Sequence, residues 1–94
     1  MSAKDLILNI AVNLGRLGRW AMEKKPKRMK IFLLETEGFL EQLEKAPKSD
    51  RFQKTFDLFS KKFVLLKNDV QLDDDWAEQM LTWANILSHR AKLA

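Results

Sequence analysis

The sequence has no cysteine, and its 94 residues include only three glycines, two prolines and one histidine. The lack of cysteine excludes disulfide bonds and thiolate metal sites, which fits a reducing compartment. Glycine and proline are too scarce for the many turns of a β-sandwich or β-barrel. No apolar run approaches the roughly 20 residues of a membrane span, and the run Leu6–Leu8 is too short for a signal peptide. We therefore expect a soluble, cytoplasmic protein without a membrane partner.

Apolar residues instead recur at alternating steps of three and four, a spacing that places them on one face of a helix. The pattern begins with Ala3, Ile7, Ile10 and Leu14, and it resumes three times along the chain. It predicts four helices over about residues 3–24, 27–46, 50–67 and 74–92. No stretch alternates apolar and polar residues as a half-buried strand would.

The connections between these helices are short, so consecutive helices should lie antiparallel. The expected fold is all-α, a single domain of residues 1–94 built as an antiparallel up-down-up-down four-helix bundle. All six phenylalanines belong to the second and third helices. We therefore expect the densest part of the core between those two helices.

Polar residues at the helix ends fit this division of the chain. Ser2 is placed to cap the first helix, and Ser49 or Asp50 to cap the third. Asp75 and Glu78 have the spacing of a capping box for the fourth helix. The carboxylates of 73–75 also suit the positive end of that helix, which is a plainer role than binding a divalent cation.

The charge is uneven along the chain. Residues 1–30 hold eight Lys or Arg and two Asp or Glu, a net of +6, whereas residues 31–94 have a net of −2. Cations beside an exposed indole can neutralise phosphates and stack on a base. Helical spacing places Asn9, Asn13, Arg16 and Trp20 on the outer side of the first helix. The candidate residues for anion or nucleic-acid binding are Arg16, Arg19, Trp20, Lys24, Lys25, Lys27, Arg28 and Lys30.

We call residues 24–30, which connect the first two helices and carry five of these cations, the basic hairpin. A structural role is the favoured alternative for it. In an up-down bundle the connection between the third and fourth helices lies at the same end and carries Asp69 and Asp73–Asp75. The two connections could pair their charges, although exposed ion pairs contribute only about 0–1 kcal/mol each. The acidic connection would also repel an approaching nucleic acid.

Several large apolar residues fall outside the core stripes. If they gather into one patch, that patch marks an interface with a second copy or another protein. The candidate interface residues are Ile31, Leu34, Leu58, Leu65, Ile86 and Leu93, with Val12 as a further outward residue.

Ala11, Gly15 and Gly18 form an edge of small residues on the first helix. An interior glycine costs about 0.5–1 kcal/mol relative to alanine, so two of them predict close approach of a neighbouring helix. That neighbour is either the fourth helix or a helix of another subunit.

Nothing in the sequence points to catalysis, a cofactor or a metal. There is no nucleophile–base pairing and no cofactor fingerprint, and the single His89 has no ligand set around it. We therefore expect a non-catalytic protein-interaction or structural module that self-associates as a homodimer. The alternative is a nucleic-acid or anion-binding domain that uses the basic hairpin.

Overall fold

The computed structural model describes all 94 residues and contains helices but no β-strand. The α-helices are α1 (Ala3–Met22), α2 (Met29–Lys45), α3 (Asp50–Asn68) and α4 (Asp74–Arg90). A 3₁₀ turn, η1 (Pro26–Arg28), leads into α2, and a second, η2 (Ala91–Leu93), continues α4. The prediction of an all-helical chain is confirmed, and each helix boundary lies within about two residues of its expected place.

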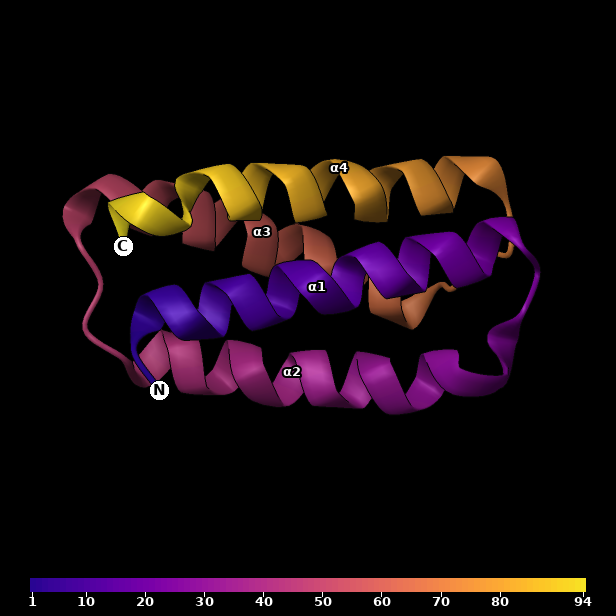
Figure 1. The fold of residues 1–94 in the computed structure, drawn as a ribbon, viewed down its shortest axis with the longest axis horizontal. Coiled ribbons are helices and arrows are strands. Elements are labelled where there is room, and N and C mark those ends of the chain that lie inside the picture. The colour runs from indigo at the N-terminus through magenta and orange to yellow at the C-terminus, as the bar shows by residue number, and fades with distance from the viewer.

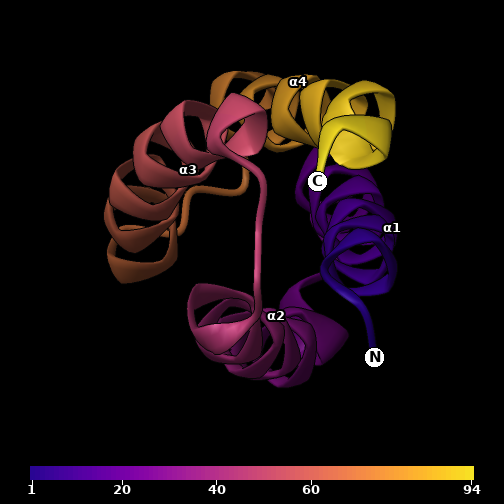
Figure 2. The ribbon, with the colours of Figure 1, turned by 90° about the vertical axis from the view of Figure 1, so that its left-hand side faces the viewer.

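The four α-helices lie along the long axis of a body whose Cα extents are 37 × 20 × 18 Å (Figure 1). Both termini and the α2–α3 connection lie at one end, and the α1–α2 and α3–α4 connections lie at the other. Viewed along the long axis, the helices follow one another around the molecule in chain order (Figure 2). The basic and the acidic connections are therefore at the same end.

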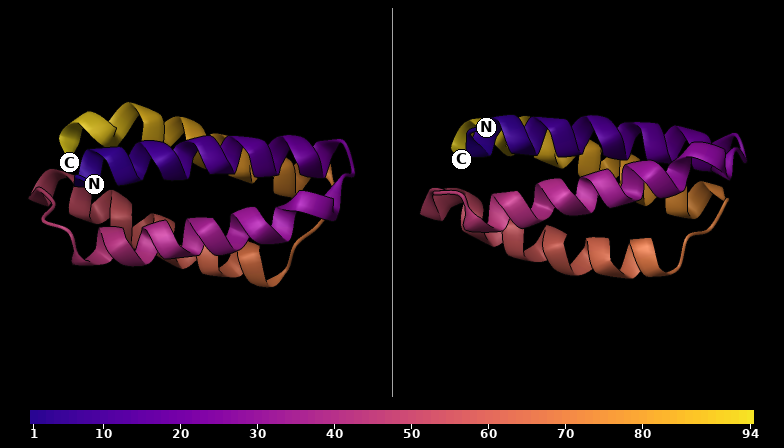
Figure 3. Two further views of the ribbon diagram at one scale, coloured as in Figure 1. Left: turned by 60° about the horizontal axis from the view of Figure 1, so that its bottom comes forward. Right: turned by 90° about the horizontal axis from the view of Figure 1, so that it is seen from below.

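Helix α1 contributes most to the core, because its wide apolar stripe packs against both α4 and α2. Ten of its residues are buried, whereas α2 buries only Met29, Thr36 and Leu43. Helix α1 packs closely against α4 and α2, while α2 and α3 lie farther apart (Figures 2 and 3). One contiguous apolar core of 20 residues results.

The expectation that α2 and α3 form the densest part of the core is wrong. Helix α3 does bury four phenylalanines, and Phe59 stacks near Phe63 and Trp83 with ring centroids 5.7 and 5.4 Å away. In α2, however, Phe32 and Phe39 are only half-buried. The closest helix pair is α1 with α4, because small residues allow their backbones to approach.

Gly18 is the point of that close approach. A Cβ at Gly18 would lie 2.8 Å from Leu81 Cγ and 3.0 Å from the backbone oxygen of Ala77. The predicted packing role therefore holds for Gly18, with α4 as the neighbour. It does not hold for Gly15, where a Cβ would meet nothing within 4 Å.

Two of the helix starts carry side-chain caps. Ser2 and Asp5 form a complete capping box at α1, as the spacing predicts for Ser2. At α4 the cap is Asp73, whose Oδ1 accepts from the Trp76 backbone N–H at 2.8 Å. The expectation of a capping box from Asp75 and Glu78 is wrong, because α4 begins at Asp74, two residues earlier than that box requires.

The α2–α3 connection is held by its own polar side chains. Lys48 Nζ donates to the carbonyl oxygens of Leu43 and Glu44 at 2.7 and 3.0 Å, which satisfies the end of α2. Ser49 occupies the N-cap position of α3 without capping it, and its hydroxyl donates instead to the Leu93 carbonyl oxygen. The connection is thus tied to the C-terminal end of the chain.

Candidate interaction surfaces

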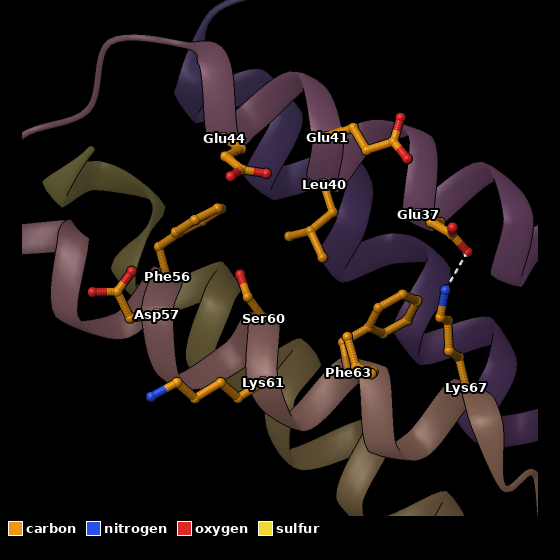
Figure 4. Close-up of a pocket in the computed structure, with 11 residues that line it drawn as sticks. Glu37, Leu40, Glu41, Glu44, Phe56, Asp57, Ser60, Lys61, Phe63 and Lys67 are labelled. Atoms are coloured by element: carbon orange, nitrogen blue, oxygen red, sulfur yellow. Dashed lines mark hydrogen bonds and ion pairs between the residues drawn. The ribbon is translucent and has the colours of Figure 1, made fainter.

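The largest hollow on the surface lies between α2 and α3, the pair that does not pack closely. It has a volume of about 460 Å³ and is lined by 11 residues. We call it the α2–α3 groove. Its apolar part comes from Leu40, Phe56, Phe63 and Val64, and Figure 4 shows Leu40 reaching from α2 toward the two phenylalanines of α3. Three glutamates, Asp57, Ser60 and two lysines complete the lining.

The two walls of the α2–α3 groove differ in charge. The α2 wall carries Glu37, Glu41 and Glu44, which follow one another at helical spacing. The α3 wall carries Lys61 and Lys67 together with one carboxylate, Asp57. A single ion pair crosses the groove, from Lys67 Nζ to Glu37 Oε2 at 2.7 Å (Figure 4). Glu41, Glu44 and Lys61 have no ion-pair partner in the chain.

Ser60 provides the one buried side-chain polar atom without a partner. Its Oγ is covered from solvent and makes no hydrogen bond. Figure 4 shows this hydroxyl directed toward the groove, between Phe56 and Phe63. A buried hydroxyl without a hydrogen bond costs about 1–3 kcal/mol, so a polar group brought into the groove would recover part of that energy.

Sequence reasoning missed this groove, because its residues lie beside the main apolar stripes. Val64 follows the buried Phe63 directly and is 46 % exposed. Phe56, Ser60 and Val64 step by four along α3 and define a second stripe, which a wider helical-wheel search could have found.

The candidate interface residues fall into two groups. Ile31, Leu34, Leu58 and Leu65 are exposed, as expected, whereas Ile86 and Leu93 are half-buried. Leu58 and Leu65 share one face of α3, and Leu65 lines a shallow hollow with α4 residues such as Gln79. None of these six residues lines the α2–α3 groove.

The basic hairpin begins with a strained residue, Lys24, whose φ is +54°. The Lys25 N–H donates to the Trp20 carbonyl oxygen at 2.8 Å, and the Lys24 N–H donates to Ala21 at 3.2 Å. This is a Schellman motif with lysine at the left-handed position that usually holds glycine. The Lys24 ammonium crosses to the α3–α4 connection and donates to the Leu72 carbonyl oxygen at 3.1 Å.

One residue of α1 and three of the basic hairpin line a second hollow of about 350 Å³, which we call the Trp20 hollow. They are Trp20, Lys25, Lys27 and Arg28. The Trp20 ring packs against Phe32 with centroids 5.2 Å apart, and Arg16 lies 5.4 Å from the same Phe32 ring. The structure thus brings three of the seven predicted cations together with Trp20. Arg19, Lys24 and Lys30 are exposed outside this hollow.

The basic α1–α2 connection and the acidic α3–α4 connection do not form the ion pairs expected between them. The chain contains two ion pairs within 4.0 Å, Lys25–Glu23 and Lys67–Glu37, and neither involves Asp69 or Asp73–Asp75. The connections meet instead through the Lys24 hydrogen bond to a backbone carbonyl. The Asp73 carboxylate caps α4, which is one reason that it does not reach the lysines of the basic hairpin.

Asn13 departs from its expected position on the outer side of α1. It is buried, and its Nδ2 donates to Glu35 Oε1 of α2 at 3.0 Å. A polar residue in the α1–α2 interface fixes the alignment of those helices, which the helical wheel could not reveal. His89 lies exposed on α4 with Nδ1 2.9 Å from the Asn85 carbonyl oxygen.

No three histidine, aspartate or glutamate side chains converge where they could hold a metal ion. None of the helices combines the length and the apolar character that crossing a membrane requires. Comparison with known proteins adds no assignment, since no family model, no curated protein and no solved structure matches the chain. The surfaces described above therefore carry the functional argument.

Proposed function

We propose that this chain is a non-catalytic interaction module that self-associates as a two-fold dimer through the α2–α3 groove. In this proposal the four helices of each copy form an antiparallel up-down-up-down bundle that is open between α2 and α3, and the second copy covers that opening. The observation that carries the proposal is a groove with an apolar floor and walls of opposite charge. A cytoplasmic location, expected from the lack of cysteine, accords with this role.

The apolar floor supplies a reason to associate. Leu40 and Val64 leave apolar surface in contact with water at the groove, directly beside the buried Phe56 and Phe63. Burying apolar surface is favourable by about 25 cal/mol for each Å² removed from water. A helix of a second copy that enters the groove would cover this surface and could offer a partner to the Ser60 hydroxyl.

The charged walls supply a reason for the partner to be a second copy. A two-fold axis that runs along the groove, parallel to its helices, places α2 of each copy beside α3 of the other. Glu41 and Glu44 of one copy would then face Lys61 of the other, twice in each dimer. Opposite charges at such positions favour this pairing over like-charged partners.

The test is the mass in solution, measured by sedimentation equilibrium or light scattering at micromolar concentration. We expect a dimer for the wild-type chain. We expect Val64→Lys to give a monomer, because the ammonium would be placed in the apolar groove. The matched control is Leu65→Lys, since Leu65 is 66 % exposed on the same helix and does not line the groove.

The possible outcomes separate the parts of this proposal. A dimer that Leu65→Lys disrupts and Val64→Lys does not would move the interface to the outer face of α3 with Leu58. A wild-type chain that stays monomeric at the highest soluble concentration would remove self-association altogether. Circular dichroism of both variants checks that each change leaves the helices intact.

A further inference from the structure

The Trp20 hollow is lined only by one indole and three cations. No carboxylate is among its lining residues. The indole is held in place by the Phe32 ring on one side. A half-buried aromatic ring beside a hollow of this size is a platform on which a planar ligand can stack.

Only one of the three cations around this platform has an anionic partner. Lys27 and Arg28 have no acidic side chain within 4.0 Å, and Lys25 has only the exposed Glu23 at 3.7 Å. Arg16, Arg19 and Lys30 extend the positive surface beyond the hollow without an ion pair. The carboxylates of the α3–α4 connection form no ion pair with these cations, so the cationic groups can still contact a ligand directly.

From this arrangement we infer that the Trp20 hollow binds single-stranded nucleic acid. One base stacks on Trp20, and the phosphates beside it lie against Lys25, Lys27 and Arg28. The site lies on α1 and the basic hairpin, away from the α2–α3 groove, and it does not depend on self-association.

A single strand fits this hollow better than a duplex. In a duplex the bases are stacked on one another and their faces are not available to an indole, whereas a single strand can turn a base outward. The hollow also has a volume of about 350 Å³, which suits one base and part of its sugar.

The experiment is a titration of a fluorescein-labelled oligothymidylate of about 12 nucleotides, followed by anisotropy. We expect binding at low salt with a slope of log K against log salt of about −2, because three phosphate contacts on a single strand contribute about −0.7 each. The labelled strand avoids the tryptophan emission of Trp76 and Trp83. The corresponding duplex should bind more weakly at the same salt.

Two variants separate stacking from charge. Trp20→Leu should weaken binding about tenfold or more and leave the salt slope unchanged. The triple variant Lys25→Gln, Lys27→Gln, Arg28→Gln should weaken binding and bring the slope close to zero. Its matched control is Lys4→Gln, Lys54→Gln, Lys92→Gln, which removes the same charge from exposed positions elsewhere and should bind like the wild type.

Four results would overturn the inference. The first is no binding of the oligothymidylate at low salt, and the second is an equal loss of affinity in the hairpin variant and its control. The third is a duplex that binds as tightly as the single strand. The fourth is tighter binding to vesicles of anionic lipid than to the single strand. Equal loss would mean that only the net charge of the chain attracts the oligonucleotide. Wild-type binding by a correctly folded Trp20→Leu variant would remove the stacking role.

Discussion

Gly18 of α1 lies directly against Leu81 of α4, so that a Cβ at this glycine would be 2.8 and 2.9 Å from Leu81 Cγ and Cδ2. The backbone oxygen of Ala77 would be 3.0 Å away on the same side. Ala77 is fully buried, and its small side chain lets the two backbones approach. This contact explains why α1 and α4 can pack so closely.

Replacing the two glycines of α1 by alanine should have opposite effects. Gly15→Ala should stabilise the fold by about 0.5–1 kcal/mol, because alanine favours the helix and a Cβ meets nothing within 4 Å. Gly18→Ala should destabilise it by about 1 kcal/mol or more, because a Cβ overlaps Leu81 and the Ala77 backbone. Urea unfolding of both variants measures the difference. Equal stabilities would mean that Leu81 moves aside without cost.

These two glycines also show which features of the fold can be predicted from the sequence and which cannot. The spacing of apolar residues locates the helices well, because a helix with a stripe of period 3.6 must bury that stripe. The same spacing cannot say which neighbour each stripe meets. Gly15 and Gly18 look alike in the sequence, and only the position of Leu81 distinguishes them. Likewise, the spacing does not reveal that the phenylalanines of α2 are half-buried while those of α3 are buried.

Of the two candidate sites, the sequence predicts one and does not reveal the other. The sequence locates the basic hairpin because its basic residues are close together in the chain, and the structure gathers Trp20 with three of them. The α2–α3 groove joins residues from 37 to 67, which belong to different helices. Its lining depends on the distance between two helices, which the spacing of apolar residues along each helix does not reveal.

Two neighbouring aspartates at the start of α4 should differ in their contribution to stability. Asp73→Ala should cost about 1 kcal/mol, because the Asp73 carboxylate caps the helix by accepting from the Trp76 N–H. Asp75→Ala should cost only a few tenths, since its carboxylate acts through the helix dipole alone. Thermal unfolding of the two variants gives the comparison. A larger loss for Asp75→Ala would restore the capping box expected from the sequence.

Lys24 allows a test of backbone strain that is independent of its side-chain contact. Both Lys24→Ala and Lys24→Gly remove the hydrogen bond to the Leu72 carbonyl oxygen. Only glycine also relieves the left-handed backbone at φ +54°. The glycine variant should therefore be more stable than the alanine variant by about 1 kcal/mol. Chemical denaturation measures both, and equal values would show that the turn relaxes to another conformation in the alanine variant.

Reversal of charge on the two walls of the α2–α3 groove should abolish and then restore the proposed dimer. Glu41→Lys with Glu44→Lys places three lysines at each contact between copies, counting Lys61, and should give a monomer. Lys61→Glu should do the same by gathering three glutamates. A mixture of the two variants should form a one-to-one dimer, because each α2 wall then faces the opposite charge in its partner. Sedimentation of the separate and mixed variants measures this recovery, and raised salt should weaken it. If the mixture stays monomeric while the wild type is a dimer, the copies meet elsewhere and the two-fold arrangement through this groove is wrong.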